Sequence, residues 1–257
     1  MSDYTDIKAL NWSTLKLMAD SPLLYSWRQS CKPVEDKPAY VMGRAVHVAI
    51  LEPDRMDDLY VQQPDWVDRR TKKGKAWLAE QDGREVLTPD QWATAEGCAR
   101  AVAKHGDASA LLADTQRELT VEWKVENVEC KGRVDAVKRM ALPDLKTCRS
   151  LERFERDAAQ FLYRGQLAFY FDGARAAGLL DANADAYIIA VETGEPHDVA
   201  AFRLPDWHLQ QGRNLYQRLL ATLLECERTN TWPGRFPGVT DLDLPRWADD
   251  EGEGEDW

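Results

Sequence analysis

Residues 131–146, K-G-R-V-D-A-V-K-R-M-A-L-P-D-L-K, carry more functional information than any other stretch of the chain. They place Asp135 at the end of an alternating segment, and Asp144 and Lys146 after a short apolar run. Side chains alternate along a strand, so Asp144 and Lys146 should point to the same face. Two carboxylates and one ammonium at one spot are costly for a purely structural sheet, but they suit a divalent metal and an anionic transition state. The alternative is an ordinary ion pair at a solvated strand end.

Apolar spacing and chain breakers predict a mixed α/β order of helix, three strands, helix and strand. The expected helices are two short ones within 12–28 separated by Ser21-Pro22, a buried helix at 40–52 that Pro53 ends, a capped helix from Thr88 to about Lys104, a long helix from about Phe154 to Ala177 that Gly178 ends, and an amphipathic helix from Asp206 to about Arg228. The expected strands form a three-strand meander within 118–147, with turns at Asn127 and at Lys138-Arg139, and a further pair near 184–192 and 197–203. The charged stretch 61–84 is expected to be a loop or a mobile segment.

Bulk composition limits the class of protein. A chain of 257 residues with 44% hydrophobic residues fits one large domain or two small ones. No long uncharged apolar run and no signal-peptide pattern is present, which predicts a cytoplasmic protein without a membrane span, in a bacterium or a phage-infected host. The five cysteines are scattered without a C-x-x-C pair, which argues against a disulfide framework and against a zinc or iron–sulfur site.

The net charge of −11 is unevenly distributed. Residues 241–257 carry −7 of it, which leaves −4 on residues 1–240, where basic clusters such as 69–75 occur. An acidic chain can still bind DNA through a small basic groove, although not as a histone-like protein does. The acidic tail at 241–257 is expected to be disordered, either as a solubilising terminus or as a segment that competes with DNA or docks a partner through Trp257.

Other polar residues lie where they could join the first cluster. They are His47, four residues after Gly43 on the apolar helix; Glu118 and Glu122 on the first strand; and Gln166 and Tyr170 on one face of the following helix. Each also has a plain structural interpretation. His47 would be a hydrogen-bonded core histidine, Glu118 and Glu122 a solvated strand face, and Gln166 and Tyr170 a pair on the helix surface.

Taken in order, these motifs resemble the PD-(D/E)xK nuclease superfamily, in the branch of the RecB nuclease domain and the phage-type RecE (exodeoxyribonuclease VIII) exonucleases. The matching text is G-R-A-V-H-V-A-I-L-E-P-D, E-L-T-V-E-W, C-K-G-R-V-D, P-D-L-K-T and Y-R-G-Q-L-A-F-Y-F-D-G, within roughly residues 10–205. The chain departs from some members in lacking an iron–sulfur cysteine cluster and a helicase motif, and in having Asp144 where glutamate is commoner. The resemblance implies a restriction-endonuclease-like core with extra N-terminal and C-terminal helices, forming one nuclease domain over residues 1–240.

The resemblance also implies roles for individual residues. Mg²⁺, which Mn²⁺ could replace, would be held by His47, Asp135, Asp144 and the carbonyl of Leu145, with Glu118 as a further contact. Lys146 would orient the attacking water or balance charge on the phosphate, while Gln166 and Tyr170 would hold the strand or Lys146 in register. The expected DNA contacts are Arg133 as a phosphate clamp, together with Arg69, Arg70, Lys72 and Lys73.

The function that the resemblance implies is a Mg²⁺-dependent DNA exonuclease. It would degrade duplex ends, with 5′-to-3′ polarity, to leave single strands for recombination, alongside a single-strand annealing protein. A homo-oligomeric ring is expected, a tetramer rather than a trimer. The alternatives are a structure-specific or single-strand endonuclease on the same scaffold, and a non-catalytic DNA-end-binding adaptor, which the intact Asp135, Asp144 and Lys146 disfavour.

Overall fold

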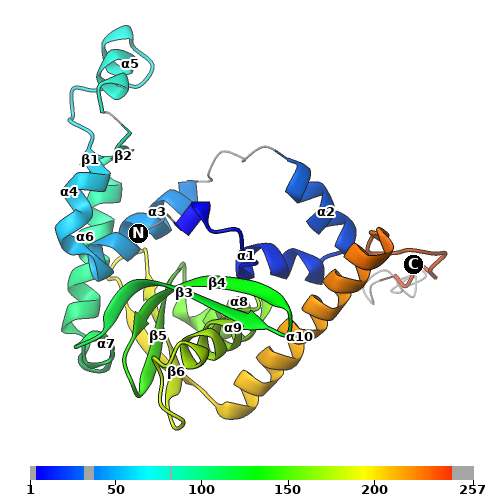
Figure 1. Ribbon diagram of the computed structural model, residues 1–257. Coiled ribbons are helices and arrows are strands. Elements are labelled where there is room, and N and C mark those ends of the chain that lie inside the picture. Colours follow the sequence, from blue (N-terminus) through cyan, green and yellow to red (C-terminus); the bar gives the residue numbers. More distant parts are fainter. Residues whose placement is uncertain (1–3, 32–37, 82, 245–257) are drawn as a thin grey trace, which may run out of the picture.

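Alternating burial along residues 116–137 produces a long antiparallel hairpin. In the computed structural model, which describes residues 4–31, 38–81 and 83–244, strand β3 (Gln116–Val125) pairs with β4 (Val128–Val137), and Val121 lies opposite Gly132 (Figure 1). The predicted turn at Asn127 is confirmed, and its neighbour Glu126 takes a left-handed conformation with φ of 54°. The hairpin thereby fixes which residues of the two strands face each other.

The described elements form a mixed α/β fold rich in helix, with small sheets. In chain order the helices, with η for 3-10 helices, are η1 (Tyr4–Asp6), α1 (Trp12–Leu15), η2 (Lys16–Ala19), α2 (Pro22–Ser30), α3 (Pro38–Leu51), η3 (Pro53–Arg55), α4 (Met56–Leu59), α5 (Lys72–Ala79), α6 (Pro89–Lys104), α7 (Gly106–Leu112), η4 (Leu151–Arg153), α8 (Phe154–Gln160), α9 (Tyr163–Ala176) and α10 (Asp206–Thr229). The other strands are β1 (Tyr60–Gln62), β2 (Glu85–Leu87), β5 (Ala141–Cys148), β6 (Asp185–Glu192) and β7 (Val199–Leu204). None of the helices in the described ranges combines the length and hydropathy that a bilayer span requires.

Strand β5 does not continue the hairpin as the third strand of a meander, so that prediction is wrong. It pairs in parallel with β6, which pairs antiparallel with β7. The turn after β4 closes with a single bridge between Lys138 and Ala141. Further along, the backbone amide of Leu145 donates to the side chain of Asp135, at 2.7 Å, instead of to a strand carbonyl. A side chain therefore joins β4 to β5 at this point.

Strand β6 is buried on both faces, which accounts for its run of apolar residues. Ile188 and Ala190 belong to one core cluster, together with residues of α1, α9 and α10, whereas Ile189 and Val191 belong to a second cluster, together with residues of α3 and α6. The parallel partner strand β5 follows the same alternation, and Leu145 belongs to the second cluster. Its neighbours Asp144 and Lys146 therefore face the opposite side together, as the spacing of two predicted.

Most predicted helices are confirmed. The chain at 12–28 forms short helices separated at Ser21, whose hydroxyl caps α2. Thr88 caps α6 with the reciprocal hydrogen bonds of a capping box, and α3 contributes Ala45, Val46 and other buried residues to the core. The last helix, α10, runs from Asp206 as expected. Residues 245–257 of the predicted acidic tail lie outside the described part of the chain.

Two predicted segments differ in the structure. The expected loop at 61–84 contains helix α5, which Thr71 caps through a hydrogen bond to the Gly74 amide, and strands β1 and β2 lie at its two ends. The expected helix at 154–177 is broken into α8 and α9, because Leu162 takes a left-handed conformation with φ of 59°. Gly178, with φ of 73°, ends α9 as predicted.

Glycines let α9 lie close against the hairpin. A Cβ atom on Gly173 would lie 2.6 Å from the indole of Trp123 on β3, and one on Gly132 would lie 2.9 Å from the ring of Tyr170 on α9. Both distances are shorter than a carbon contact allows, so these positions need glycine for packing. The close approach sets the position of α9 relative to β4.

We expect Gly173→Ala to lower the free energy of unfolding by about 1–3 kcal/mol, because the added methyl group overpacks the α9–β3 contact. Urea unfolding followed by circular dichroism measures the change. Gly106→Ala is the matched control, since nothing lies within 4 Å of a Cβ at that position. Equal stabilities for the two variants would contradict the close packing described here.

Candidate active site

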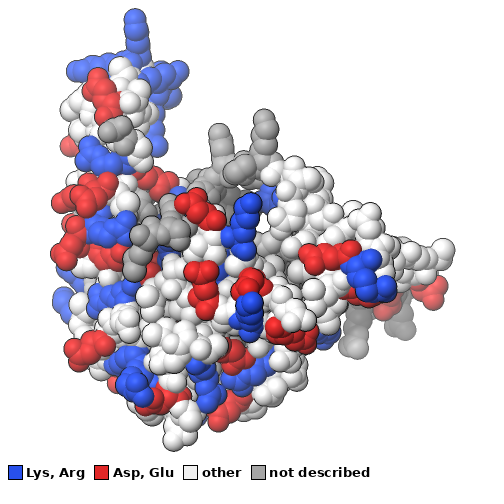
Figure 2. Space-filling model, in the orientation of Figure 1, with Lys and Arg blue, Asp and Glu red and all other residues white. Residues whose placement is uncertain are grey.

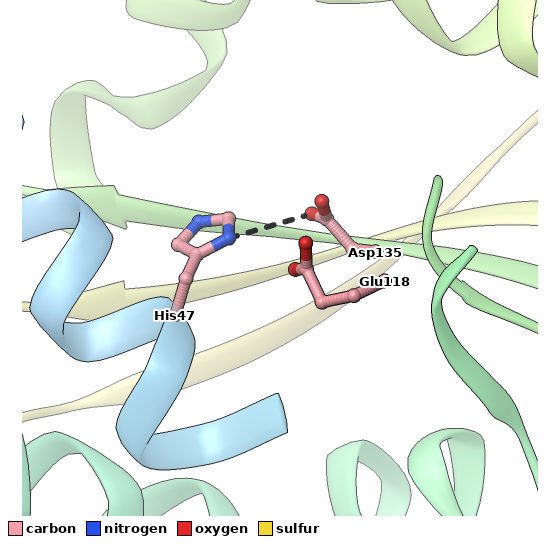
Figure 3. A group of neighbouring side chains, drawn as sticks. All are labelled: His47, Glu118 and Asp135. Carbon is pink, nitrogen blue, oxygen red and sulfur yellow. Dashed lines mark ion pairs between the residues drawn. The ribbon is translucent and has the colours of Figure 1, made fainter. Parts of the chain in front are cut away.

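Side chains from three elements point toward one another at the open edge between α3 and the hairpin. His47 comes from α3, Glu118 from β3 and Asp135 from β4, as Figure 3 shows. One ligand atom of each lies within 4.8 Å of the others, and His47 Nδ1 lies 3.9 Å from Asp135 Oδ2. The side chains of His47 and Asp135 are 27% and 14% exposed, so a small ion can reach them from solvent.

Glu118, predicted above only as a further contact of the metal, is a full member of this group. The hairpin ladder pairs Arg117 with Ala136 and Leu119 with Val134, which leaves Glu118 across from Asp135. Glu118 has φ of 49°, a left-handed conformation that costs a non-glycine residue about 1–2 kcal/mol. Counting residues outward from a two-residue turn at Glu126-Asn127 gives the same register, and this signal supports the prediction of Glu118 beside Asp135.

Asp144 and Lys146 form a buried ion pair beside this group. The Asp144 side chain is 2% exposed, and the Lys146 ammonium contacts Asp144 Oδ2. Neither Asp144 oxygen accepts a hydrogen bond of normal geometry from the described residues, which is unusual for a buried carboxylate. Asp144 is not one of the three residues grouped around His47, so the expected set of ligands is divided between two adjacent positions.

The Leu145 peptide connects the two positions. Its N–H donates to Asp135 Oδ2 at 2.7 Å, and its carbonyl accepts from Lys146 Nζ at 3.3 Å. The Leu145 backbone also lies close enough to His47 to raise the pKa of its ring slightly, against the larger effect of burial. The carbonyl predicted as a metal ligand therefore lies beside His47 and Lys146.

Burial shifts the pKa values of Glu118, Asp144, Asp135 and His47 in the direction that favours the neutral form of each side chain. Burial, reinforced by Asp135 and Glu52, raises the pKa of Glu118 to about 7. Burial also raises the pKa of Asp144 to about 6, although Lys146 opposes the shift, and it raises the pKa of Asp135. Burial and the Lys146 charge lower the pKa of His47 to about 4, so its imidazole is neutral at pH 7.

Lys146 keeps its charge in these surroundings. Burial by itself would lower its pKa, but Asp144 and Asp135 hold the pKa of Lys146 above its ordinary value. The ammonium also lies 5.2 Å from the ring centre of Tyr163 at the start of α9. Sequence reasoning missed Tyr163, which lies one helical turn before Gln166 and could have been found by that spacing.

The donor set fits a divalent cation. Carboxylates whose pKa values are raised by burial and mutual repulsion become stable anions once a cation lies between them. Asp144 Oδ1 has no hydrogen-bond partner among the described residues, and His47 offers a neutral ring nitrogen. Carboxylate oxygens suit Mg²⁺ and Mn²⁺, and one imidazole is compatible with Mn²⁺.

Of the other predicted residues, some lie at the site and some do not. Tyr170 packs on Gly132, burial raises its pKa further above 10, and its neighbours include Gln166, Asp144 and Asp135. Arg133 is exposed, lies 5.0 Å from the Tyr4 ring centre and lowers the pKa of Glu118 from outside the group. By contrast, four predicted DNA contacts lie on the segment that projects from the body: Arg69, Arg70, Lys72 and Lys73 (Figure 1).

Binding of Mg²⁺ or Mn²⁺ should release protons, because Glu118 and Asp144 hold protons near neutral pH in the metal-free site. The raised pKa values mean that protons compete with the metal at pH 6 and have largely left by pH 8. We therefore expect metal affinity to increase over this range, by up to about tenfold per pH unit for each proton displaced. Calorimetric titration in two buffers with different ionisation enthalpies measures the protons released.

Glu118→Gln should reduce that release and weaken binding, whereas Glu122→Gln, at an exposed position on the same strand, should not. His47→Ala should also weaken binding. Unchanged metal affinity in His47→Ala, with lower stability, would instead make His47 a core histidine.

Comparisons with known proteins identify the fold and the family of this chain. A crystal structure at 2.19 Å resolution from Eubacterium rectale, described as a "Putative exonuclease", superposes with a TM-score of 0.67, covering 98% of this chain and 96% of that one. The sequences are 14% identical, so this likeness shows the fold alone. No curated protein matches the chain. The model of the family described as "PDDEXK-like domain of unknown function (DUF3799)" matches residues 5–241, and the chain therefore belongs to this family of PDDEXK-like domains.

Proposed function

We propose that the protein is a metal-dependent nuclease that hydrolyses phosphodiester bonds in DNA from duplex ends. The observation that carries the proposal is the buried Asp144–Lys146 ion pair, in which Asp144 Oδ1 has no hydrogen-bond partner among the described residues, beside the His47, Glu118 and Asp135 group. The PDDEXK-like family and the fold shared with the Eubacterium rectale protein support it.

The chain's own residues account for most of what hydrolysis requires. A water oxygen bonds to phosphorus, the bond to one bridging oxygen breaks, and the departing oxygen takes up a proton while the water loses one. His47 and the carboxylates would hold a divalent cation, which would supply a Lewis acid that lowers the pKa of the water. The Lys146 ammonium, charged at neutral pH, donates hydrogen bonds to the water or to a phosphate oxygen.

Neighbouring residues position this chemistry. Arg133 is exposed at the rim of the site, where its guanidinium can hold a phosphate oxygen without entering the buried group. Tyr170 packs against Gly132 of β4, with Gln166 beside it on α9, and the pair so keeps the surroundings of Lys146 in place. Their role is positioning rather than contact with the reacting atoms.

The finer parts of the proposal go beyond the site chemistry. We propose a 5′-to-3′ direction, single-stranded products for recombination with a single-strand annealing partner, and a ring of several copies, a tetramer rather than a trimer. A ring would hold DNA near the site of a chain whose net charge is −11. Light scattering that gives a monomer at micromolar concentration would contradict the ring.

Asp135→Asn, Asp144→Asn and Lys146→Ala should each lower the cleavage rate by at least about 10²-fold, because each removes a charge that acts on the phosphate or its cation. The assay measures cleavage of three DNA substrates: linear duplex labelled at one end, nicked duplex and closed circles. Each is incubated with Mg²⁺, Mn²⁺ or EDTA, and the comparison shows whether cleavage requires a DNA end. The matched controls are Asp181→Asn and Lys124→Ala, which alter surface ion pairs.

Cleavage of closed circles would favour the endonuclease alternative on the same scaffold. Binding of DNA ends without any cleavage in Mg²⁺ or Mn²⁺ would favour the non-catalytic adaptor. Wild-type rates in Asp135→Asn or Asp144→Asn, with circular dichroism confirming the fold, would contradict the active-site assignment.

A further inference from the structure

The segment between Tyr60 and Leu87 projects from the body as an arm (Figure 1). Its root is fixed: Tyr60 is 4% exposed, Leu87 is fully buried, and both belong to the core cluster that includes Val46. Two hydrogen bonds of 3.1 Å from Arg44 on α3 to Glu85 on β2 add to this attachment. Because Arg44 lies three residues before His47, the arm is anchored to the helix that carries the candidate metal ligand.

The tip of the arm is a small folded unit of its own. None of the described residues between 61 and 86 belongs to either core cluster of the body. The tip instead buries Val67, packs Trp66 edge-on against Trp77, and caps α5 with Thr71. A Cβ atom on Gly74 would lie 1.9 Å from the Asp68 carbonyl oxygen, so this tight fold requires glycine.

One stretch of this unit is strongly basic, although acidic residues also lie on the arm. Residues 69–75, R-R-T-K-K-G-K, hold five basic side chains and no acidic one, in a chain whose net charge is −11. In Figure 2, blue side chains surround the tip of the arm. Like charges this close repel one another, so the tip gains electrostatically when an anion binds.

The basic residues differ in how far internal contacts occupy them. Arg69 donates to Gln63 and to the Val86 carbonyl, and so braces the arm. Arg70 pairs with Asp68, and Lys73 lies 4.4 Å from the ring centre of Trp66. Three of the five basic side chains are therefore held by contacts within the arm.

The side chains of Lys72 and Lys75 make no ion pair or hydrogen bond with any described residue, and both are exposed on α5. They lie three apart on one helix, so their ammonium groups project from the same side. Two unpaired ammonium groups on one side of a helix suit the repeating phosphates of a nucleic-acid backbone.

We propose that the arm binds the phosphate backbone of substrate DNA at a distance from the scissile bond, with Lys72 and Lys75 as its contacts. The inference rests on the proposed function for the identity of the substrate, and it adds a second binding surface to the active site. Arg69 braces the arm through its hydrogen bonds to Gln63 and Val86. Because backbone contacts carry no sequence information, the arm increases affinity uniformly across DNA sequences.

The test compares wild type with Lys72→Ala/Lys75→Ala and with Lys104→Ala/Arg218→Ala, a control that removes two exposed charges from α6 and α10. Fluorescence anisotropy with a short labelled duplex, in EDTA and between about 50 and 200 mM salt, gives the affinity and its salt dependence. The arm variant should weaken binding and make the slope of log affinity against log salt shallower by about 0.9 for each phosphate that no longer has a lysine partner. The control pair should keep the wild-type slope.

Hydrolysis of bis(p-nitrophenyl) phosphate, measured with Mn²⁺, separates the arm from the active site, because this ester is too small to reach the arm. The arm variant should hydrolyse it at the wild-type rate. A wild-type salt slope in the arm variant, or an equal change in the control pair, would overturn the proposal. If wild type cleaves neither this ester nor linear duplex DNA in Mn²⁺, the proposed function fails. The salt slopes of binding still decide whether the arm binds DNA.

Discussion

The hydrogen bond from the Leu145 amide to the Asp135 carboxylate is the contact on which the candidate site depends. It joins the hairpin β3–β4 to β5, two strand systems that share no continuous ladder. Through it, Asp135 and Glu118 on the hairpin come to lie beside Asp144 and Lys146 on β5. Asp135 is thus both a structural acceptor and a candidate ligand, which is why asparagine, whose side-chain oxygen can still accept the amide, is the informative substitution there.

Electrostatic conflict is the second feature of the site. Burial raises the pKa values of Glu118, Asp135 and Asp144, and a single ammonium from Lys146 opposes the shift at the two aspartates. The left-handed backbone of Glu118 adds conformational strain at the same place. A fold that served only stability would gain by replacing such a cluster with apolar side chains. A bound dication would remove the conflict by stabilising all three carboxylates as anions.

Local periodicity predicted much of this from the sequence. A spacing of two put Asp144 and Lys146 on one face, and capping and breaker residues located α2, α6 and the end of α9. The pairing of β5 could not be read locally, because its partner β6 lies some forty residues later and only the packed fold selects it. The arm is folded where a loop was expected, because the few apolar residues of this charged stretch, around Val67 and Trp77, pack together.

The central claim is that one cation binds where the hairpin, α3 and β5 meet. Anomalous diffraction from crystals soaked in Mn²⁺ tests it most directly. The account predicts a Mn²⁺ peak in contact with Asp135 and with at least one of Glu118, His47 and Asp144. The distance from the peak to each oxygen ligand should lie within about 2.0–2.6 Å, as for other hard cations. A peak elsewhere on the chain, or none at millimolar Mn²⁺ with the Asp144–Lys146 pair unchanged, would contradict the account.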